Sequence, residues 1–295
     1  MRKIAVMSDV HGNVGALKSV IKDAKDLGCS SYWLLGDLFL PGSGTEELLT
    51  ILDELPIESY VCGNWETHLL RGIDTPIDAK NPIQVYHAIL ADYFWRGLTN
   101  ESLNYIRELP MKQSKYVDGI NYQLTHNQPK ITMVMRWHQP RVRQPLNWPT
   151  MMQILWWHTH QQLLRQSSQG KLILNPGTIG MPAPQWENFS SDLRAQYAVI
   201  SIDKIGTIPN IEFRWVVYDI ENELALAKQK ELPYLELYAE QLNTGVAHTR
   251  DVERHSTINN QPRYRELLQV VLNRINKYDE QRWYDIAYKK WRFTQ

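Results

Sequence analysis

Residues that can bind metal ions recur in this chain at the ends of apolar runs. The complete set, in chain order, is Asp9, His11, Asp37, Asn64, His126, His158 and His160. Carboxylate, imidazole and amide groups without a thiolate suit a hard or borderline divalent ion. Manganese and iron are favoured on this chemistry, and zinc is also compatible.

The number of these groups points to two ions. Seven ligands are too many for one transition-metal ion, but they suit two ions that share a bridging carboxylate. Two ions about 3.5–4 Å apart can hold the attacking and the leaving oxygen of an in-line phosphoryl displacement. Asp9 alone could be a helix cap, and Asp37 alone could be an ordinary acidic loop residue. Helix capping does not explain all seven residues together. The sequence therefore predicts a hydrolase of phosphorus esters with two divalent cations.

The apolar pattern predicts the elements that position these ligands. Three short apolar runs read as buried strands, and each ends in a small residue followed by a polar side chain. These runs span residues 3–8, 32–37 and 57–64. The carboxyl ends of the strands of an open α/β sheet line its ligand crevice, so we expect the three strands to deliver their ligands to one place.

Periodicity and turn residues predict the remaining elements. The predicted helices cover residues 13–27, 45–55, 83–109, 221–230, 234–242 and 261–295, and the predicted hairpins cover residues 116–126, 161–174 and 197–218. The fold class is therefore α/β (α+β), a two-sheet β-sandwich flanked by helices with a helical C-terminal extension. We place the catalytic domain at residues 1–218 and the extension, packed on this domain or on a partner subunit, at residues 219–295.

Five separated motifs give the chain a family resemblance. The order Asp-x-His, Gly-Asp, Gly-Asn-x-Glu, His and x-His-Thr-His resembles the calcineurin-like metallophosphoesterases from Met1 to about Tyr218. The resemblance implies that one ion is held by Asp9, His11 and His160, that the other is held by Asn64, His126 and His158, and that Asp37 bridges them. It also implies attack on phosphorus by a hydroxide bound between the ions, without a covalent enzyme intermediate. On this basis the catalytic residues are expected to be Asp37, Asn64 and His126.

Two tryptophans depart from the family pattern. Trp65 stands where many members carry a histidine that protonates the leaving group, so the acid must come from elsewhere or the leaving group must need none. Trp157 stands where the pattern has glycine before His-Thr-His, and it either crowds the turn or supplies a stacking wall.

Several residues are candidates for binding substrate. Trp65 and the segment 38–44 would form an aromatic rim that suits a base or aryl group, and Asn13 would reach a phosphate oxygen. The proline-rich segment 127–150 contains Arg136 and Arg141, which can bind further phosphates through forked hydrogen bonds. The alternative for this segment is a solvated surface loop.

The C-terminal tail interleaves aromatic and basic residues from Arg282 to Phe293. Such a pattern can stack on and neutralise a nucleotide, but it is also typical of a helix that docks on its own domain or on a second subunit. We favour docking on the chain's own domain or on a second subunit, and the second case would give a homodimer formed through the C-terminal helices.

Composition is consistent with a soluble enzyme. The 295 residues contain 32 basic and 32 acidic side chains, so no bulk charge favours binding to nucleic acid or to a membrane. The apolar start is too short for a signal peptide, and we expect a cytoplasmic location. Two cysteines, Cys29 and Cys62, are expected to be reduced thiols.

The predicted activity is that of a phosphodiesterase. The chain looks most like the compact bacterial phosphodiesterases of the superfamily, some of which cleave nucleotides and diadenosine polyphosphates, so a nucleotide-type or dinucleoside polyphosphate substrate is favoured. A phosphomonoesterase of small phosphates is the alternative within the class. A catalytically silent scaffold that keeps the fold is the alternative outside it, supported by Trp65 and Trp157 and opposed by the complete ligand set.

Overall fold

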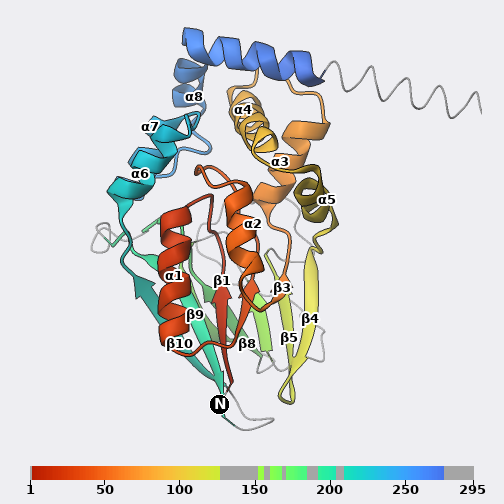
Figure 1. The fold of residues 1–295 in the computed structure, drawn as a ribbon, viewed down its shortest axis with the longest axis vertical. Helices are drawn as coiled ribbons and strands as arrows, with labels where there is room; N and C mark the ends of the chain where they lie inside the picture. The colour runs from red at the N-terminus through yellow and green to blue at the C-terminus, as the bar shows by residue number, and fades with distance from the viewer. Residues whose placement is uncertain are drawn as a thin grey trace, which may run out of the picture. The chain divides into compact units, whose positions relative to one another are not determined.

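The structure is a computed structural model that describes residues 2–126, 152–155, 160–167, 171–184, 192–203 and 209–275 (Figure 1). The chain forms two compact units. The first comprises Met1–Glu66 and Asn100–Ala247, and the second comprises Thr67–Thr99 and His248–Gln295. The predicted division of the chain at residue 218 stays a prediction.

One sheet of the first unit contains the three predicted ligand-bearing strands. The parallel strands are β1 (Arg2–Met7), β2 (Ser31–Leu34) and β3 (Ile57–Tyr60), and the antiparallel pair is β9 (Ala195–Ile202) and β10 (Asn210–Val216). The five strands run in the order β10-β9-β1-β2-β3. Because β1, β2 and β3 are parallel, their carboxyl ends meet at one edge of the sheet.

The second sheet has the order β4-β5-β6-β8-β7. Its strands are β4 (Lys112–Val117), β5 (Ile120–Thr125), β6 (Met152–Leu155), β7 (Gln162–Gln166) and β8 (Leu172–Pro176). The turn between β4 and β5 has φ values of 49° at Asp118 and 85° at Gly119. Two successive positive φ angles are typical of the tight primed turn that Asp-Gly favours, and the predicted hairpin is confirmed.

The core of the first unit lies between the two sheets. Ile4, Val6 and Trp33 of the first sheet share one buried cluster with Tyr122 and other apolar residues of the second. The rings of Trp33 and Tyr122 meet edge to face with their centroids 5.0 Å apart. Each fully buried aliphatic or aromatic side chain contributes about 1.5–3 kcal/mol. The predicted two-sheet sandwich is confirmed.

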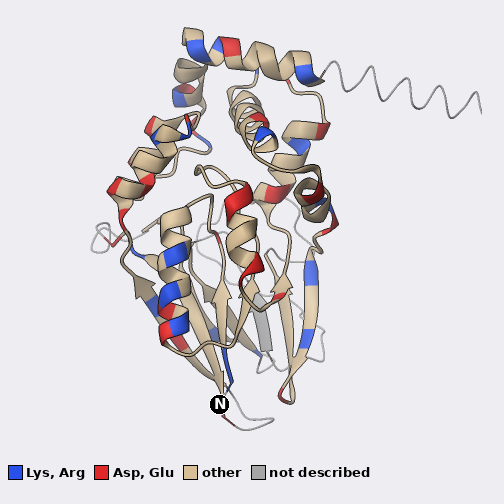
Figure 2. Cartoon of the chain, viewed as in Figure 1, with Lys and Arg blue, Asp and Glu red and all other residues tan. Residues whose placement is uncertain are grey.

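Helices complete the first unit. They are α1 (Val14–Asp26), α2 (Glu46–Asp53), α5 (Asn100–Glu108), α6 (Ile220–Gln229) and α7 (Leu235–Thr244). The side chain of Asn13 caps α1 by accepting the N–H of Ala16, and α1 packs on β9, β10 and α6. The helix α1 carries both Lys and Asp side chains (Figure 2), three of the first and two of the second.

The second unit is helical where it is described. It contains α4 (Pro82–Arg96), α8 (Val252–Asn259), a helix over residues 262–275 and most of α3 (Asn64–Asp74). The single helix predicted over residues 83–109 is wrong: α4 ends with Gly97 as its C-cap, and α5 begins separately at Asn100. Glycine ends the helix because it leaves the helical pattern at little cost.

A buried arginine holds the second unit together. Arg274 donates from Nε to Oδ1 of Asp92 at 2.8 Å, and its two Nη groups donate to the carbonyls of Gly72 and Ile73 at the end of α3. Its guanidinium also lies 5.1 Å from the ring centroid of Trp95. Arg274 therefore joins two helices of this unit to the helix over residues 262–275.

Within the described residues, no helix is both long and apolar enough to cross a lipid bilayer.

Candidate metal centre

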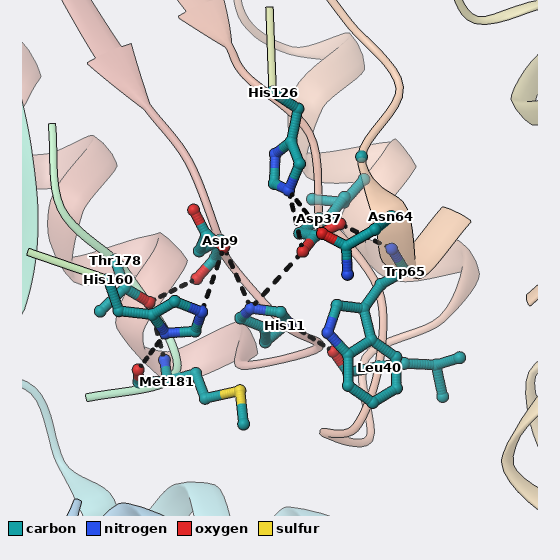
Figure 3. Close-up of polar contacts among 12 residues, drawn as sticks. Asp9, His11, Asp37, Leu40, Asn64, Trp65, His126, His160, Thr178 and Met181 are labelled. Atoms are coloured by element: carbon teal, nitrogen blue, oxygen red, sulfur yellow. Dashed lines mark hydrogen bonds and ion pairs between the residues drawn. The ribbon is translucent and has the colours of Figure 1, made fainter. Parts of the chain in front are cut away.

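Five loops that follow or precede strands bring the predicted ligands together (Figure 3). Asp9 and His11 follow β1, Asp37 follows β2, and His126 follows β5. The remaining ligands described are Asn64, the first residue of α3, and His160, which lies just before β7. The side chains of Asp9, His11, Asp37, His126 and His160 are buried. Six of the seven predicted ligands therefore converge, and His158 lies outside the described residues.

The ligands fall into two sets that share Asp9. The first set is Asp9, His11 and His160, and the second is Asp9, Asp37 and His126. Within each set the potential ligand atoms all lie within 4.8 Å of one another. A group of that size can close around a single ion, so the buried cluster has room for two neighbouring ions.

In the first set, both imidazoles face the carboxylate of Asp9. Nε2 of His11 lies 3.2 Å from Asp9 Oδ1, and Nε2 of His160 lies 3.5 Å from the same oxygen. The two imidazole rings are stacked with centroids 5.1 Å apart.

In the second set, His126 lies between two oxygen ligands. Its Nε2 is 3.1 Å from Asp37 Oδ2 and 3.0 Å from Asn64 Oδ1. Asp37 also faces the first set, because its Oδ2 is 3.9 Å from Nε2 of His11. Both carboxylates therefore lie between the two sets, and the resemblance assigns the bridging position to Asp37.

A backbone carbonyl fixes the tautomer of each histidine. Nδ1 of His11 donates to the carbonyl of Leu40 at 2.6 Å, Nδ1 of His126 to Leu35 at 2.6 Å, and Nδ1 of His160 to Met181 at 2.7 Å. A carbonyl oxygen only accepts, so each Nδ1 carries the hydrogen. Each Nε2 is then directed at the carboxylates, and in the neutral form of the imidazole its lone pair is available to a cation.

Burial and neighbouring charges shift the pKa values of the side chains in the cluster. Burial lowers the pKa of His11 and that of His160. Burial also raises the pKa of Asp9 to about 7. Burial opposes the charged form of His126 too, but the charge and hydrogen bond of Asp37 outweigh it and raise the pKa of His126 to about 9. Burial likewise opposes ionisation of Asp37, yet the charge of His126 holds the pKa of Asp37 below its usual range.

These side chains fit divalent cations. Among the residues described, Oδ2 of Asp9 is buried without a hydrogen-bond donor, and Oδ2 of Asp37 has Nε2 of His126 3.1 Å away. A neutral His11 also directs a lone pair at an Asp9 oxygen only 3.2 Å away. Buried acceptors that face each other are unfavourable unless a cation or proton lies between them. Divalent ions would satisfy these oxygens and nitrogens together.

The backbone at the ligands adopts a sparsely populated conformation. The φ angles are 56° at Asp9, 52° at His11, 54° at Asp37 and 53° at His160. Non-glycine residues rarely adopt positive φ, and each such residue costs about 1–3 kcal/mol. Four of the eight described non-glycine residues with this conformation are ligands, so strain is concentrated at the site.

Glu66 is a buried residue of the site to which the sequence analysis gives no role. Its Oε2 accepts the N–H groups of Gly63 and Asp37 at 2.7 and 2.9 Å, and its Oε1 accepts the N–H of Leu38 at 2.8 Å. Glu66 thereby ties the loop of Asp37 to the start of α3, which carries Asn64. The sequence signal was its place as the third residue of a helix, from which a glutamate reaches back to the N-cap as in half of a capping box.

The turn Asn175-Pro-Gly-Thr178 and the residues after it form hydrogen bonds with the backbone of the first set. The hydroxyl of Thr178 donates to the carbonyl of Asp9 at 3.1 Å, and the N–H of Gly180 donates to the same carbonyl at 2.9 Å. Met181, which accepts from His160, follows directly. This turn therefore packs beside the candidate metal centre.

The predicted substrate contacts are not equally accessible. Trp65 is only 4% exposed, and its indole meets the ring of His11 edge to face at 5.8 Å, so it forms a wall of the cluster. Asn13 is buried, with its Oδ1 accepting from Ala16 and its Nδ2 donating to Gly180. Arg136, Arg141 and Trp157 lie outside the described residues. Contact of substrate with any of them stays a prediction.

A sandwich with buried carboxylates and imidazoles at the ends of its parallel strands is the architecture of a metal-dependent hydrolase. The chain belongs to the calcineurin-like phosphoesterase superfamily, whose domain profile matches residues 2–204. This match confirms the resemblance seen in the motifs, and it identifies the chain as a metal-dependent phosphoesterase.

Individual relatives agree with the family assignment. An uncharacterized protein of Methanocaldococcus jannaschii is 26% identical over 195 residues, which cover 61% of this chain and 76% of that protein. The crystal structure of a metallophosphoesterase from Sphaerobacter thermophilus is 25% identical, covers 83% of this chain and 100% of its own, and has a TM-score of 0.62. A hypothetical protein from Pyrococcus horikoshii OT3 shares the fold, with 18% identity, coverage of 84% and 100%, and a TM-score of 0.63.

Proposed function

We propose that this protein is a binuclear-metal phosphodiesterase that acts on nucleotide-type or dinucleoside polyphosphate substrates. The observation that supports it most is the pair of buried carboxylates, Asp9 and Asp37, whose oxygens lie inside the cluster. The Nε2 atoms of His11, His126 and His160 face these oxygens. Manganese and iron are the favoured metals, and zinc remains compatible with the ligands.

The chain's own residues would hold and orient the reacting groups. Asp9, His11 and His160 would hold one ion, His126, Asn64 and His158 the other, and Asp37 would lie between them. When bound, such ions polarise phosphoryl oxygens and make water a better nucleophile at neutral pH. Trp65 would exclude water from the His11 side of the centre, since its buried indole covers that ring.

Trp65, the residue beside Asn64, restricts the kind of leaving group that the site can release. An indole N–H does not transfer a proton near neutral pH, so Trp65 cannot act as a general acid. An ester with a poor alkoxide leaving group needs such an acid, whereas a phosphate leaving group carries its charge without one. This difference supports cleavage of a phosphoanhydride or an activated diester over that of an alkyl phosphate.

The proposal is tested by metal titration of the chelated protein followed by hydrolysis assays. We expect two equivalents of manganese to bind and to restore cleavage of bis-p-nitrophenyl phosphate. Cleavage of dinucleoside polyphosphates should exceed that of p-nitrophenyl phosphate and of mononucleotides, and the reverse order would make the protein a phosphomonoesterase. Asp37→Asn and His158→Ala should abolish turnover, because each removes a ligand.

The silent scaffold is the second candidate, and the buried Trp65 beside His11 is the observation that favours it. A scaffold would bind the ions without cleaving any ester on the panel.

A homodimer formed through the C-terminal helices and a cytoplasmic location remain our proposals. Analytical ultracentrifugation and fractionation of cells test them.

A further inference from the structure

The helical hairpin of α6 and α7 contacts loops of the metal centre, although it lies beyond the residues that match the family profile. The family match ends at residue 204, whereas the hairpin begins at Ile220. Both helices nonetheless belong to the first unit, together with the ligand loops. The side chain of Glu223 on α6 is fully buried, although Glu221 two residues earlier is exposed. A buried carboxylate is costly unless its partners compensate it, so its contacts identify what it supports.

Glu223 joins the hairpin to the loop that follows β1. Its Oε2 accepts the N–H of Gly15 at 2.8 Å, in the first turn of α1, where the helix dipole favours negative charge. Its Oε1 accepts the hydroxyl hydrogen of Tyr238 on α7 at 3.0 Å. The loop thus held is short and contains both Asp9 and His11.

Two further contacts reach the backbone around the histidines of the same set. A Cβ placed on Gly42 would lie 2.7 Å from the Tyr238 hydroxyl and 2.6 Å from the carbonyl oxygen of His11, so the three groups are in close contact. The N–H of Gly42 donates to that carbonyl at 2.8 Å. On α7, Nε2 of Gln241 donates to the carbonyl of Pro182.

The Pro182 contact supports the last ligand of the set. Pro182 follows Met181, whose carbonyl accepts from Nδ1 of His160 at 2.7 Å. Glu223 and Gln241 therefore reach loops around Asp9, His11 and His160, and Tyr238 reaches the His11 carbonyl beside Gly42, in the loop that follows β2. The start of that loop, at Asp37 and Leu38, and the start of α3 are held by Glu66.

We propose that the α6–α7 hairpin braces one of the two ion sites, that of Asp9, His11 and His160, and that Glu223 is its central positioning residue. The proposal rests on the proposed function only in requiring that the ligands bind ions. Residues that orient metal ligands typically change metal affinity about 10–100-fold when they are replaced. The hairpin should therefore change the affinity of this site more than that of the other, which shares only Asp9 with it.

The test is isothermal titration of the chelated full chain with manganese. Wild type should bind two equivalents. Glu223→Ala and Tyr238→Phe should each bind one equivalent about 10–100-fold more weakly and the other with a smaller loss of affinity. Glu223→Gln should recover most of the loss, because an amide can accept from Gly15 and donate to the Tyr238 oxygen. Glu221→Gln, the same change at an exposed position of the same helix, should bind like wild type.

A ligand variant identifies the weakened site. His11→Ala removes a ligand of the braced site, so adding Glu223→Ala to it should weaken the surviving equivalent no more than Glu223→Ala alone weakens the less affected equivalent. Equal weakening of both equivalents, or unchanged binding in Tyr238→Phe, would overturn the proposal. Should Glu223→Ala fail to fold, Tyr238→Phe decides alone, since it removes one hydroxyl. A wild type that binds no manganese would instead refute the proposed function.

Discussion

Glu66 offers the sharpest test of how the loops of the site are held. Replacing it with glutamine keeps the volume of the side chain but removes its charge and one of its two acceptor oxygens. The remaining oxygen can accept from Gly63 and Asp37, but the new NH₂ group then faces the N–H of Leu38, donor against donor. The variant thus loses one charge-assisted hydrogen bond and leaves a buried N–H unsatisfied.

The expected effect is large for an isosteric change. A hydrogen bond to a charged group contributes about 1.5–3 kcal/mol, and an unsatisfied buried donor costs about 1–3 kcal/mol. Because these terms overlap, we expect Glu66→Gln to lower the free energy of unfolding by about 3 kcal/mol. For a unit of this size that corresponds to a fall in Tm of roughly 6–12 °C.

The assay is thermal unfolding of the chelated protein, followed by manganese titration. The affinity of the site formed by Asp37, Asn64 and His126 should fall about 10–100-fold, since Glu66 orients the loops that carry it. Glu101→Gln is the matched control, because Glu101 also lies in the first turn of a helix of the first unit but is exposed. A Tm of Glu66→Gln within 2 °C of the control, with both ions bound as in wild type, would refute this reasoning.

Three further predictions concern other parts of the chain. Trp65→His should accelerate cleavage of substrates with poor leaving groups relative to those with good ones, and a uniform slowing in steady-state assays would show that Trp65 acts by packing or stacking. Arg274→Met should destabilise the second unit by about 3–5 kcal/mol in urea unfolding, because Asp92 keeps its contact with Arg96 but loses its buried partner; a loss under 1 kcal/mol would contradict this. Burial, together with His68 and His255, lowers the pKa of His87 to about 3. As the pH falls below about 6.5, the unfolded chain therefore binds a proton at His87 that the folded chain does not bind. Acidification from pH 6.5 to 4.5 should therefore cost at most about 1.4 kcal/mol per pH unit, and His87→Gln should flatten the plot of Tm against pH, whereas parallel plots would exclude His87 as the cause.

The sequence by itself determined the ligand types, their order and the strands that deliver them. Asp9 and Asp37 are recognisable because each follows an apolar run that can only be a buried strand, and the parallel pairing of these runs brings their ends together. The Asp118-Gly119 hairpin was predictable for a similar reason, since its turn conformation depends on two adjacent residues. Local patterns carry this information because strand period and turn geometry are properties of short segments.

Local patterns were less informative where two kinds of element compete. The run at residues 57–64 reads as one strand, but β3 ends at Tyr60 and Asn64 already begins α3. The predicted helix over residues 83–109 is divided at Gly97, although the apolar pattern continues past it. In both places the partner elements decide the boundary, because they determine which backbone groups find hydrogen bonds.

Only the tertiary structure decided which groups orient the ligands. His126 donates to Leu35, 91 positions earlier in the chain, and Glu66 accepts from Asp37, 29 positions earlier. Glu223 supports a loop 208 positions before it. A carboxylate that is far from the site in sequence resembles any solvated surface acid, because its burial and its partners exist only when distant segments pack together.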